Sequence, residues 1–266
     1  MNEIKVLVSK ELNQIEEQLS DLNLPNNEVF LEIQNFTKEK SKRIRSLLTL
    51  LYIRANNKEI KPEIIKVLSA AEIIHNASLL HDDVIDNAST RRGQSTVAQL
   101  FSPKISIISG DYLLTKGIDL LLTVDDNIIF KSFNKTIQKM CNAEIKQFLL
   151  RGIVPSEEEY LDICRGKTAS LFASLLESCA TFCGLPSTPA KVLGEEFGLL
   201  FQIRNDLEKF SAQADKENGI FTVKDIYGIE KTSILIDNYQ EKIREKLSTL
   251  PNNIYKNCLF DLLGKI

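Results

Sequence analysis

The sequence predicts an all-α protein, a bundle of about ten helices, from three observations. Apolar residues recur at helical spacing in one segment after another, as at Leu12, Ile15 and Leu19. The 266 residues include only 11 glycines and 7 prolines, while Leu, Ile, Lys, Glu and Asn dominate. No alternating apolar pattern bounded by hairpin signals stands out. Since 43% of the residues are hydrophobic, the chain can bury a large core.

Start and stop signals place several of the expected helices. Pro62 suits the first turn of a helix that runs to about residue 86. Ser156 and Glu159 have the spacing of a capping box, and Gly184 is expected to close the helix that carries residues 168–183. Pro189 suits the opening of the next helix. Because no repeat and no Pro/Gly/Ser-rich linker interrupts the chain, we expect a single domain over residues 1–266.

Composition narrows the class of protein. The 33 Lys and Arg residues against 36 Asp and Glu give a net charge of −3, so we expect no nucleic-acid partner. The five cysteines form no CxxC pair, which favours reduced thiols and a cytoplasmic protein. No uncharged apolar run reaches the roughly 18–20 residues of a membrane span. Any strong anion binding must therefore come from a local cluster.

The first group of residues that could bind a ligand or a metal ion is an acidic cluster followed by two arginines. On a helix, Asp82 and Asp86 project from one face, and His75 lies seven residues earlier on the same stripe. Paired carboxylates at this spacing suit Mg²⁺, which takes one or two carboxylates together with waters and phosphate oxygens. The guanidinium groups of Arg91 and Arg92 could grip a diphosphate. An acidic helix end before a solvated basic loop is the alternative interpretation.

A basic cluster spans residues 38–45, where five positive charges precede an apolar run. We expect Lys42 and Arg45 to share one helix face. A solvated helix start is the alternative, while the lack of interleaved aromatic residues argues against a nucleic-acid patch. Further along, Lys167 and Thr168 end a segment like a phosphate-binding loop, but Leu161 stands where its first glycine belongs, which excludes a nucleotide loop.

Together these stretches resemble the trans-type (E)-prenyl diphosphate synthases, which lengthen allylic diphosphates with isopentenyl diphosphate. HDDVID followed by RRG is similar to the family's first DDxxD motif with its two arginines, and KSKRIRS to GGKRxRP with both glycines and the proline replaced. Other family motifs have counterparts in SGDYLL (109–114), AEIKQ (143–147), GKTASLF (166–172) and FQIRND (201–206). The resemblance implies an isoprenoid-synthase bundle around a central cavity.

The resemblance also implies roles for individual residues. Asp82 and Asp86, supported by Asp83, would be ligands of Mg²⁺ ions that bridge the allylic diphosphate. Arg91 would clamp the same diphosphate. Isopentenyl diphosphate would be bound by Lys42, Arg45, His75 and Arg92. Groups facing the reacting carbons and the departing diphosphate would be Lys167, Thr168 and Gln202. The implied mechanism is ionisation to an allylic cation, attack by the alkene and loss of a proton.

The second Asp-rich motif departs from the family pattern. It would supply Asn205 and Asp206 as metal ligands, but its first and last aspartates are replaced by Asn205 and Lys209. The amide oxygen of Asn205 is a weaker ligand than a carboxylate. The following loop lacks both family lysines, since Ile220 stands where one belongs, and Lys209 or Lys216 could substitute. The chain is also shorter than typical members.

Three functions therefore compete. The first is an active prenyl elongase using Mg²⁺ and an allylic primer such as farnesyl diphosphate, expected as a homodimer. The second is a non-catalytic or regulatory subunit of a heteromeric synthase, suggested by Asn205, Lys209 and Ile220. The third is a terpene cyclase, which has no use for a second diphosphate site.

Small residues before the first motif bear on product length. In the family, an aromatic residue four or five positions before DDxxD blocks the tail, whereas this chain has Ser78 and Ala77 there. The floor of the tail path would then lie deeper, near Ile118, below a helix expected to start at Gly110. We expect a long, octaprenyl-like product, with geranylgeranyl diphosphate as the second choice.

Overall fold

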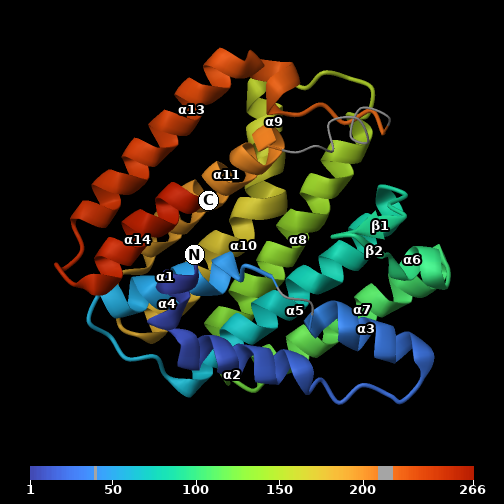
Figure 1. Ribbon diagram of the computed structural model, residues 1–266, viewed down its shortest axis with the longest axis horizontal. Coiled ribbons are helices and arrows are strands. Elements are labelled where there is room, and N and C mark those ends of the chain that lie inside the picture. The colour runs from blue at the N-terminus through green and yellow to red at the C-terminus, as the bar shows by residue number, and fades with distance from the viewer. Residues whose placement is uncertain (39–40, 209–217) are drawn as a thin grey trace. The chain divides into compact units, whose positions relative to one another are not determined.

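The computed structural model describes residues 1–38, 41–208 and 218–266, and helices dominate throughout (Figure 1). The predicted all-α fold is confirmed. Within these ranges the only strands are β1 (Thr90–Arg91) and β2 (Gln94–Ser95), a short antiparallel pair that the sequence analysis missed. The chain forms two compact units: unit 1 covers residues 1–7, 48–59 and 131–266, and unit 2 covers residues 8–47 and 60–130. The single domain over residues 1–266 stays a prediction.

Unit 2 is built around one long helix. It comprises α2 (Ser9–Ser20), α3 (Glu28–Lys38), the start of α4 (Ile44–Ala55), α5 (Pro62–Ile85), β1, β2, α6 (Val97–Leu100), α7 (Pro103–Leu122) and the start of α8 (Asn127–Leu149). Helix α5 packs against α2, α3, α6 and α7, and 14 of its 24 residues are buried. It therefore has no wide solvated face, and polar groups along it need partners within the protein.

Helix α7 begins earlier than the sequence analysis placed it. Its N-cap is Ser102, whose Oγ accepts a hydrogen bond from the Ile105 amide, and Pro103 occupies the first turn. Gly110 is therefore in the middle of the helix. A Cβ atom there would lie 2.3 Å from Nε2 of His81 on α5. The glycine allows α5 and α7 to approach closely.

Unit 1 contains the rest of the helices. It comprises α1 (Asn2–Val6), the remainder of α4 and α8, α9 (Glu157–Cys164), the π-helical turn η1 (Arg165–Ala169), α10 (Ser170–Phe182), α11 (Ser187–Glu208), α13 (Val223–Ser248) and α14 (Ile254–Lys265). Helices α10 and α11 pack side by side, α13 lies against α11, and α1 packs against α14 (Figure 1). Phe172 of α10 and Phe197 of α11 are fully buried between their helices.

The helix boundaries of unit 1 follow local signals. The Ser156 hydroxyl accepts from the Glu159 amide, and the Glu159 carboxylate accepts from the Ser156 amide, which confirms the capping box. Gly184 follows the end of α10 with φ of +68°, a backbone conformation that favours glycine. The helix expected over residues 168–183 is present as α10, but its first residues lie in η1, a π-turn that joins α9 to α10 through continuous helical backbone. Nothing in the apolar periodicity signals this wider turn.

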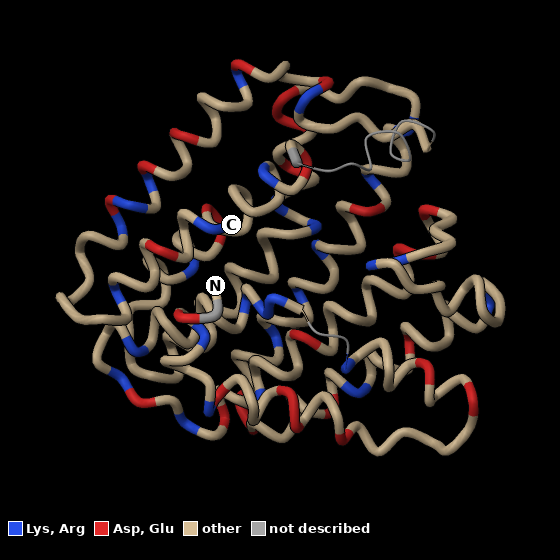
Figure 2. The backbone as a smooth tube through the Cα atoms, in the orientation of Figure 1, with Lys and Arg blue, Asp and Glu red and all other residues tan. Residues whose placement is uncertain are grey.

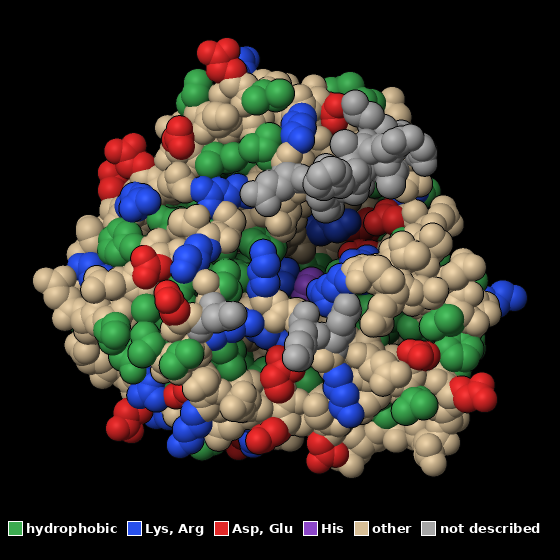
Figure 3. Space-filling view, viewed as in Figure 1, with side chains coloured by type: hydrophobic (Ala, Val, Ile, Leu, Met, Phe, Trp, Pro, Cys, Tyr) green, Lys and Arg blue, Asp and Glu red, His purple; other side chains and the backbone are tan. Residues whose placement is uncertain are grey.

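Charged side chains of both signs are interspersed over the face drawn in Figure 3, as the net charge of −3 leads one to expect. Helix α13 shows the same alternation along its length in Figure 2. In the described part of the chain, no helix combines the length and the apolar character needed to cross a membrane.

We predict that Gly198→Ala destabilises the protein by about 1–3 kcal/mol, because the added Cβ must displace packed atoms. It would lie 2.6 Å from Cα of Ala169 in η1 and 3.0 Å from Cδ2 of Phe172. Gly264→Ala in α14 is the matched control, since nothing lies within 4 Å of its Cβ. We expect it to be neutral or stabilising by up to about 1 kcal/mol. Urea unfolding of both variants measures the difference, and equal effects would contradict the packing described here.

Candidate functional site

The carboxyl end of α5 carries three aspartates in two different environments. Asp83 is buried, whereas Asp82 and Asp86 are half-buried. The helix ends at Ile85, and Asp86 caps it with its amide donating to the Asp82 carbonyl over 2.8 Å. Asp82 and Asp86 thus lie one turn apart, as predicted from their spacing.

Asp83 is turned inward and paired with Arg91. Its Oδ1 accepts from Nε of Arg91 over 2.7 Å, and its Oδ2 is buried without a hydrogen-bond partner among the described residues. Burial raises the pKa of the Asp83 carboxyl, although Arg91 opposes that shift. The pair fixes the β1–β2 hairpin to α5. Arg92 then occupies the turn of the hairpin with φ of +51°, and its side chain is exposed.

Four arginines act on His75, seven residues before Asp82. Burial lowers the pKa of His75 well below its ordinary value, and the positive charges of Arg45, Arg92, Arg91 and Arg43 lower it further. The imidazole is therefore neutral near pH 7. The four arginines that act on this one position would repel one another less if an anion were bound among them.

Lys42 and Arg45 do not share a helix face, and that prediction is wrong. Helix α4 begins only at Ile44, because Arg43 adopts φ of +49° and its amide donates to Oγ of Ser41. Lys42 is consequently exposed ahead of the helix, while Arg45 is half-buried in its first turn. The apolar run that follows residue 46 gave no sign of this left-handed residue.

Arg43 is a buried anchor that the sequence analysis did not identify. Its guanidinium makes two hydrogen bonds to the Glu16 carboxylate, at 2.8 and 3.0 Å, and one to Glu72 at 3.3 Å. Ser46 donates to the other Glu72 oxygen over 2.7 Å. Burial opposes the charge of Arg43, but Glu16 and Glu72 outweigh it and raise the pKa of Arg43. The signal for this anchor in the sequence was Glu72, a glutamate within the apolar stretch of α5.

His81 links the last turns of α5 to α7. Its Nε2 lies 3.1 Å from the Ile107 carbonyl oxygen and 3.2 Å from Oδ1 of Asp111. Because both partners are acceptors, Nε2 must carry the hydrogen. This contact, together with the close approach at Gly110, orients the turn that bears Asp82.

The two positions assigned to product length lie in the same stretch of α5. Ala77 is buried, and Ser78 is half-buried with its hydroxyl donating to the His75 carbonyl over 2.8 Å. On α7, a Cβ at Gly117 would lie 2.8 Å from Ile74, so the two helices touch just before the half-buried Ile118. Their part in setting product length stays a prediction.

In unit 1, Lys167 and Thr168 of η1 each bond to other helices. The Lys167 ammonium lies 2.6 Å from the Glu144 carboxylate and donates to Gln147 over 2.9 Å. The Thr168 hydroxyl donates to Oε1 of Gln202 over 2.6 Å. Residues 144 and 147 belong to the AEIKQ segment, whose partner the sequence alone did not specify.

Hydrogen bonds continue from Gln202 to the second Asp-rich motif. Its amide donates to Oδ1 of Asp206 over 2.8 Å, and the Tyr160 hydroxyl donates to Oδ2 over 2.8 Å. Burial and the Asp206 charge raise the pKa of Tyr160, which therefore remains a donor. Asn205 and Ile220 are half-buried, whereas Lys209 and Lys216 lie outside the described residues. Tyr160 was not among the predicted site residues.

Comparison with known proteins identifies the family. A sequence model of the polyprenyl synthetase family matches residues 27–258. The chain belongs to the polyprenyl synthetase family. Decaprenyl-diphosphate synthase of Dictyostelium discoideum is 31% identical over 211 residues, which are 78% of this chain and 46% of that protein. A prenyl transferase of Porphyra purpurea is 33% identical over 208 residues, 75% of this chain and 64% of that protein. The chain thus spans less than two thirds of either relative.

A crystal structure of a polyprenyl synthase from Caulobacter crescentus, complexed with calcium and isoprenyl diphosphate, has the same fold. Its TM-score is 0.89 at 21% identity, and the match covers 98% of this chain and 95% of that chain. This likeness confirms the isoprenoid-synthase fold expected from the motifs.

The Mg²⁺ expected for this polyprenyl synthetase family member fits the donors of unit 2. The described residues contain no group of three or more His, Cys, Asp or Glu side chains placed to hold a metal ion. Two carboxylates one turn apart, Asp82 and Asp86, suit an ion that takes its remaining ligands from water and phosphate.

We predict that His75 makes the stability of the protein pH-dependent below about pH 6.5. The pKa of His75 is lowered from 6.5 in the folded chain, so the unfolded state binds the additional proton in that window. Stability then falls as the pH drops from about 6.5 to 5, and His75→Gln should flatten this part of the curve. Urea midpoints across this pH range measure the effect. Parallel curves for wild type and variant would show that His75 is not desolvated.

Proposed function

We propose that this polyprenyl synthetase family member condenses isopentenyl diphosphate with an allylic diphosphate, farnesyl diphosphate or similar, to give a longer all-trans polyprenyl diphosphate. The observation that carries the proposal is the neutral His75 within the field of four arginines, on the helix whose carboxyl end bears Asp82 and Asp86. Such a site suits diphosphates, whose charge exceeds what one lysine or arginine can compensate. The family membership supports the same conclusion.

In unit 2 the proposed task of the side chains is to bind and orient diphosphates. Isopentenyl diphosphate would contact the four residues Lys42, Arg45, His75 and Arg92. The neutral imidazole of His75 can donate one hydrogen bond to a phosphate oxygen. Arg91 keeps guanidinium N–H donors beyond the Nε that bonds to Asp83, so it can both hold the hairpin and clamp the allylic diphosphate. Mg²⁺ bound by Asp82 and Asp86 would neutralise the departing diphosphate.

In unit 1 the proposed task is to stabilise charge during ionisation. Lys167 would stabilise the departing diphosphate, held in place by Glu144 and Gln147. Thr168 and Gln202 would direct their oxygen dipoles at the developing allylic cation. The hydrogen bond between them fixes the position of one side chain relative to the other. Asp206 and Asn205 would serve as the second, weaker metal site. The proton lost at the end would go to released diphosphate.

The two other functions are distinguished by particular residues. A non-catalytic subunit of a heteromeric synthase is favoured by Asn205 and Ile220, which replace family aspartate and lysine. A terpene cyclase is disfavoured, because it has no use for the second diphosphate site expected from Lys42, Arg45, His75 and Arg92.

Product, assembly and location complete the proposal. We expect a long-chain, octaprenyl-like product from the small residues Ala77 and Ser78. We expect a cytoplasmic homodimer, and the exposed apolar residues of α8 offer a surface for a second copy: Ile145, Phe148 and Leu149 are 58%, 57% and 69% exposed.

We predict that the purified protein converts labelled isopentenyl diphosphate and farnesyl diphosphate to longer prenyl diphosphates only with Mg²⁺ or Mn²⁺. Asp82→Ala should abolish turnover because one of two carboxylates is lost. Asn205→Asp should lower the Mg²⁺ concentration for half-maximal activity, because a carboxylate replaces an amide. Chromatography of the dephosphorylated alcohols measures the products.

The same assay separates the alternatives. Hydrocarbon products would select the cyclase, and a folded wild type that turns over only with a second protein would select the heteromeric subunit. Circular dichroism of Asp82→Ala controls for its fold, and normal turnover by this variant would overturn the metal assignment. Light scattering of the same preparation should give about twice the 30.1 kDa chain mass.

We predict that Ala77→Phe shortens the product to geranylgeranyl diphosphate from the farnesyl primer, or to farnesyl diphosphate from a shorter allylic primer. A large ring at this buried position would obstruct a tail that passes along α5. Ala77→Ser, which adds little volume, is the matched control and should keep the long product. If Ala77→Phe is active with unchanged product lengths, the tail does not pass this residue.

A further inference from the structure

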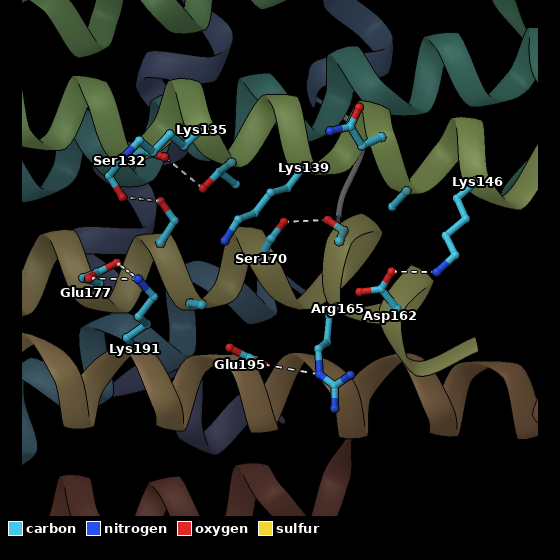
Figure 4. A pocket seen from close by; sticks show the side chains of 16 residues that line it. Ser132, Lys135, Lys139, Lys146, Asp162, Arg165, Ser170, Glu177, Lys191 and Glu195 are labelled. Carbon is cyan, nitrogen blue, oxygen red and sulfur yellow. Dashed lines mark hydrogen bonds and ion pairs between the residues drawn. The ribbon is translucent and has the colours of Figure 1, made fainter. Parts of the chain in front are cut away.

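A polar pocket of about 410 Å³ lies within unit 1, bordered by α8, α9, η1, α10 and α11 (Figure 4). Small side chains such as Ala173, Ser170 and Ser174 leave this space open on α10. At about 30 Å³ per water molecule, the volume suits a small metabolite and exceeds what a single ion fills. The hydroxyls of Ser132 and Ser174 hydrogen-bond to each other across it over 3.2 Å.

The pocket has an excess of positive charge. Three of its acidic side chains are neutralised in the pairs Lys146–Asp162, Lys191–Glu177 and Arg165–Glu195, at 2.8, 3.0 and 3.5 Å. Two further cations, Lys135 and Lys139, lie one turn apart on α8 and are exposed. In the described ranges of the chain, neither has a hydrogen-bond or ion-pair partner. Figure 4 shows Lys139 extending from α8 toward α10.

We propose that this pocket binds a small hydroxylated organic phosphate. Lys135 and Lys139 supply two positive charges at spacing that suits one phosphate dianion. The opposite wall carries Glu177 and Glu195, whose carboxylates accept hydrogen bonds from hydroxyl groups. A ligand with its phosphate group at α8 and its hydroxyl groups toward α10 and α11 would find polar partners on both walls of the pocket. A purely hydrophobic ligand would offer Lys135 and Lys139 no acidic partner.

This pocket is separate from the residues proposed for the prenyl transfer reaction. Arg165 and Gly166 of η1 border the pocket, whereas Lys167 and Thr168 of the same turn bond to Glu144 and Gln202. A Cβ at Gly166 would lie 2.5 Å from Cβ of Ala143, so η1 is packed tightly against α8 at the edge of the pocket. A ligand in the pocket would therefore lie against the turn that carries Lys167 without occupying the hydrogen bonds of Lys167.

Calorimetric titration with glycerol 3-phosphate tests the proposal. At about pH 8 the phosphate is a dianion, and EDTA removes divalent metal so that metal-dependent binding by aspartates does not contribute. We expect saturable binding of one molecule per chain that weakens as salt is added. Changing both Lys135 and Lys139 to Met should weaken binding about tenfold or more, because both charge-assisted contacts are lost. Methionine keeps much of the aliphatic length, and both sites are exposed, so folding is preserved.

Two control variants make the result decisive. Lys131→Met removes an exposed lysine one turn earlier on α8, outside the pocket lining, and should bind as wild type. Arg92→Met in unit 2 should also bind as wild type. No binding by wild type, equal loss with Lys131→Met, or loss with Arg92→Met in place of the double lysine variant would each overturn the proposal.

Discussion

The charge balance around His75 is the constraint on which the proposed site depends. Four arginines act on this residue, and such a concentration of cations is unfavourable in a partly desolvated region. Two buried carboxylates compensate for it. Glu72 is 2% exposed and binds Arg43, while Asp83 is 1% exposed and binds Arg91. Each carboxylate holds one arginine in place.

Helix α5 brings these requirements together in one element. It carries both compensating carboxylates, His75 and the aspartates proposed to hold Mg²⁺, so their spacing is fixed by helical geometry. The hairpin and the start of α4 are then attached to it through Arg91 and Arg43. The free energy gained by burying apolar residues along α5 offsets the free energy lost by burying the charged ones. A loop carrying the same side chains would place them less accurately.

Local signals in the sequence predicted much of the fold. The helix starting at Pro62 and the capping box at Ser156 depend on contacts within a few residues, and both are present. The left-handed Arg43 was not predicted, because it is stabilised by Glu16 and Glu72, which are distant in sequence. The π-turn η1 likewise has no periodic signature.

The candidate site was predictable as a set of residues but not as a set of contacts. Motif resemblance indicated Asp82, Asp83 and Arg91, yet nothing in the sequence showed that Asp83 faces inward to pair with Arg91. Tyr160 was missed because its hydrogen bond to Asp206 joins residues 46 positions apart. Such pairings depend on tertiary packing, which spacing alone does not encode.

The pKa of His75, measured by ¹⁵N NMR with and without isopentenyl diphosphate, tests the central claim most directly. His75→Gln assigns the signal, since the chain has only 2 histidines. The account predicts a pKa below 6.5 in the free protein, because burial and four arginines oppose protonation. Bound diphosphate should offset that positive field and raise the pKa by about one unit or more. A pKa near 6.5 that does not respond to isopentenyl diphosphate would contradict the account.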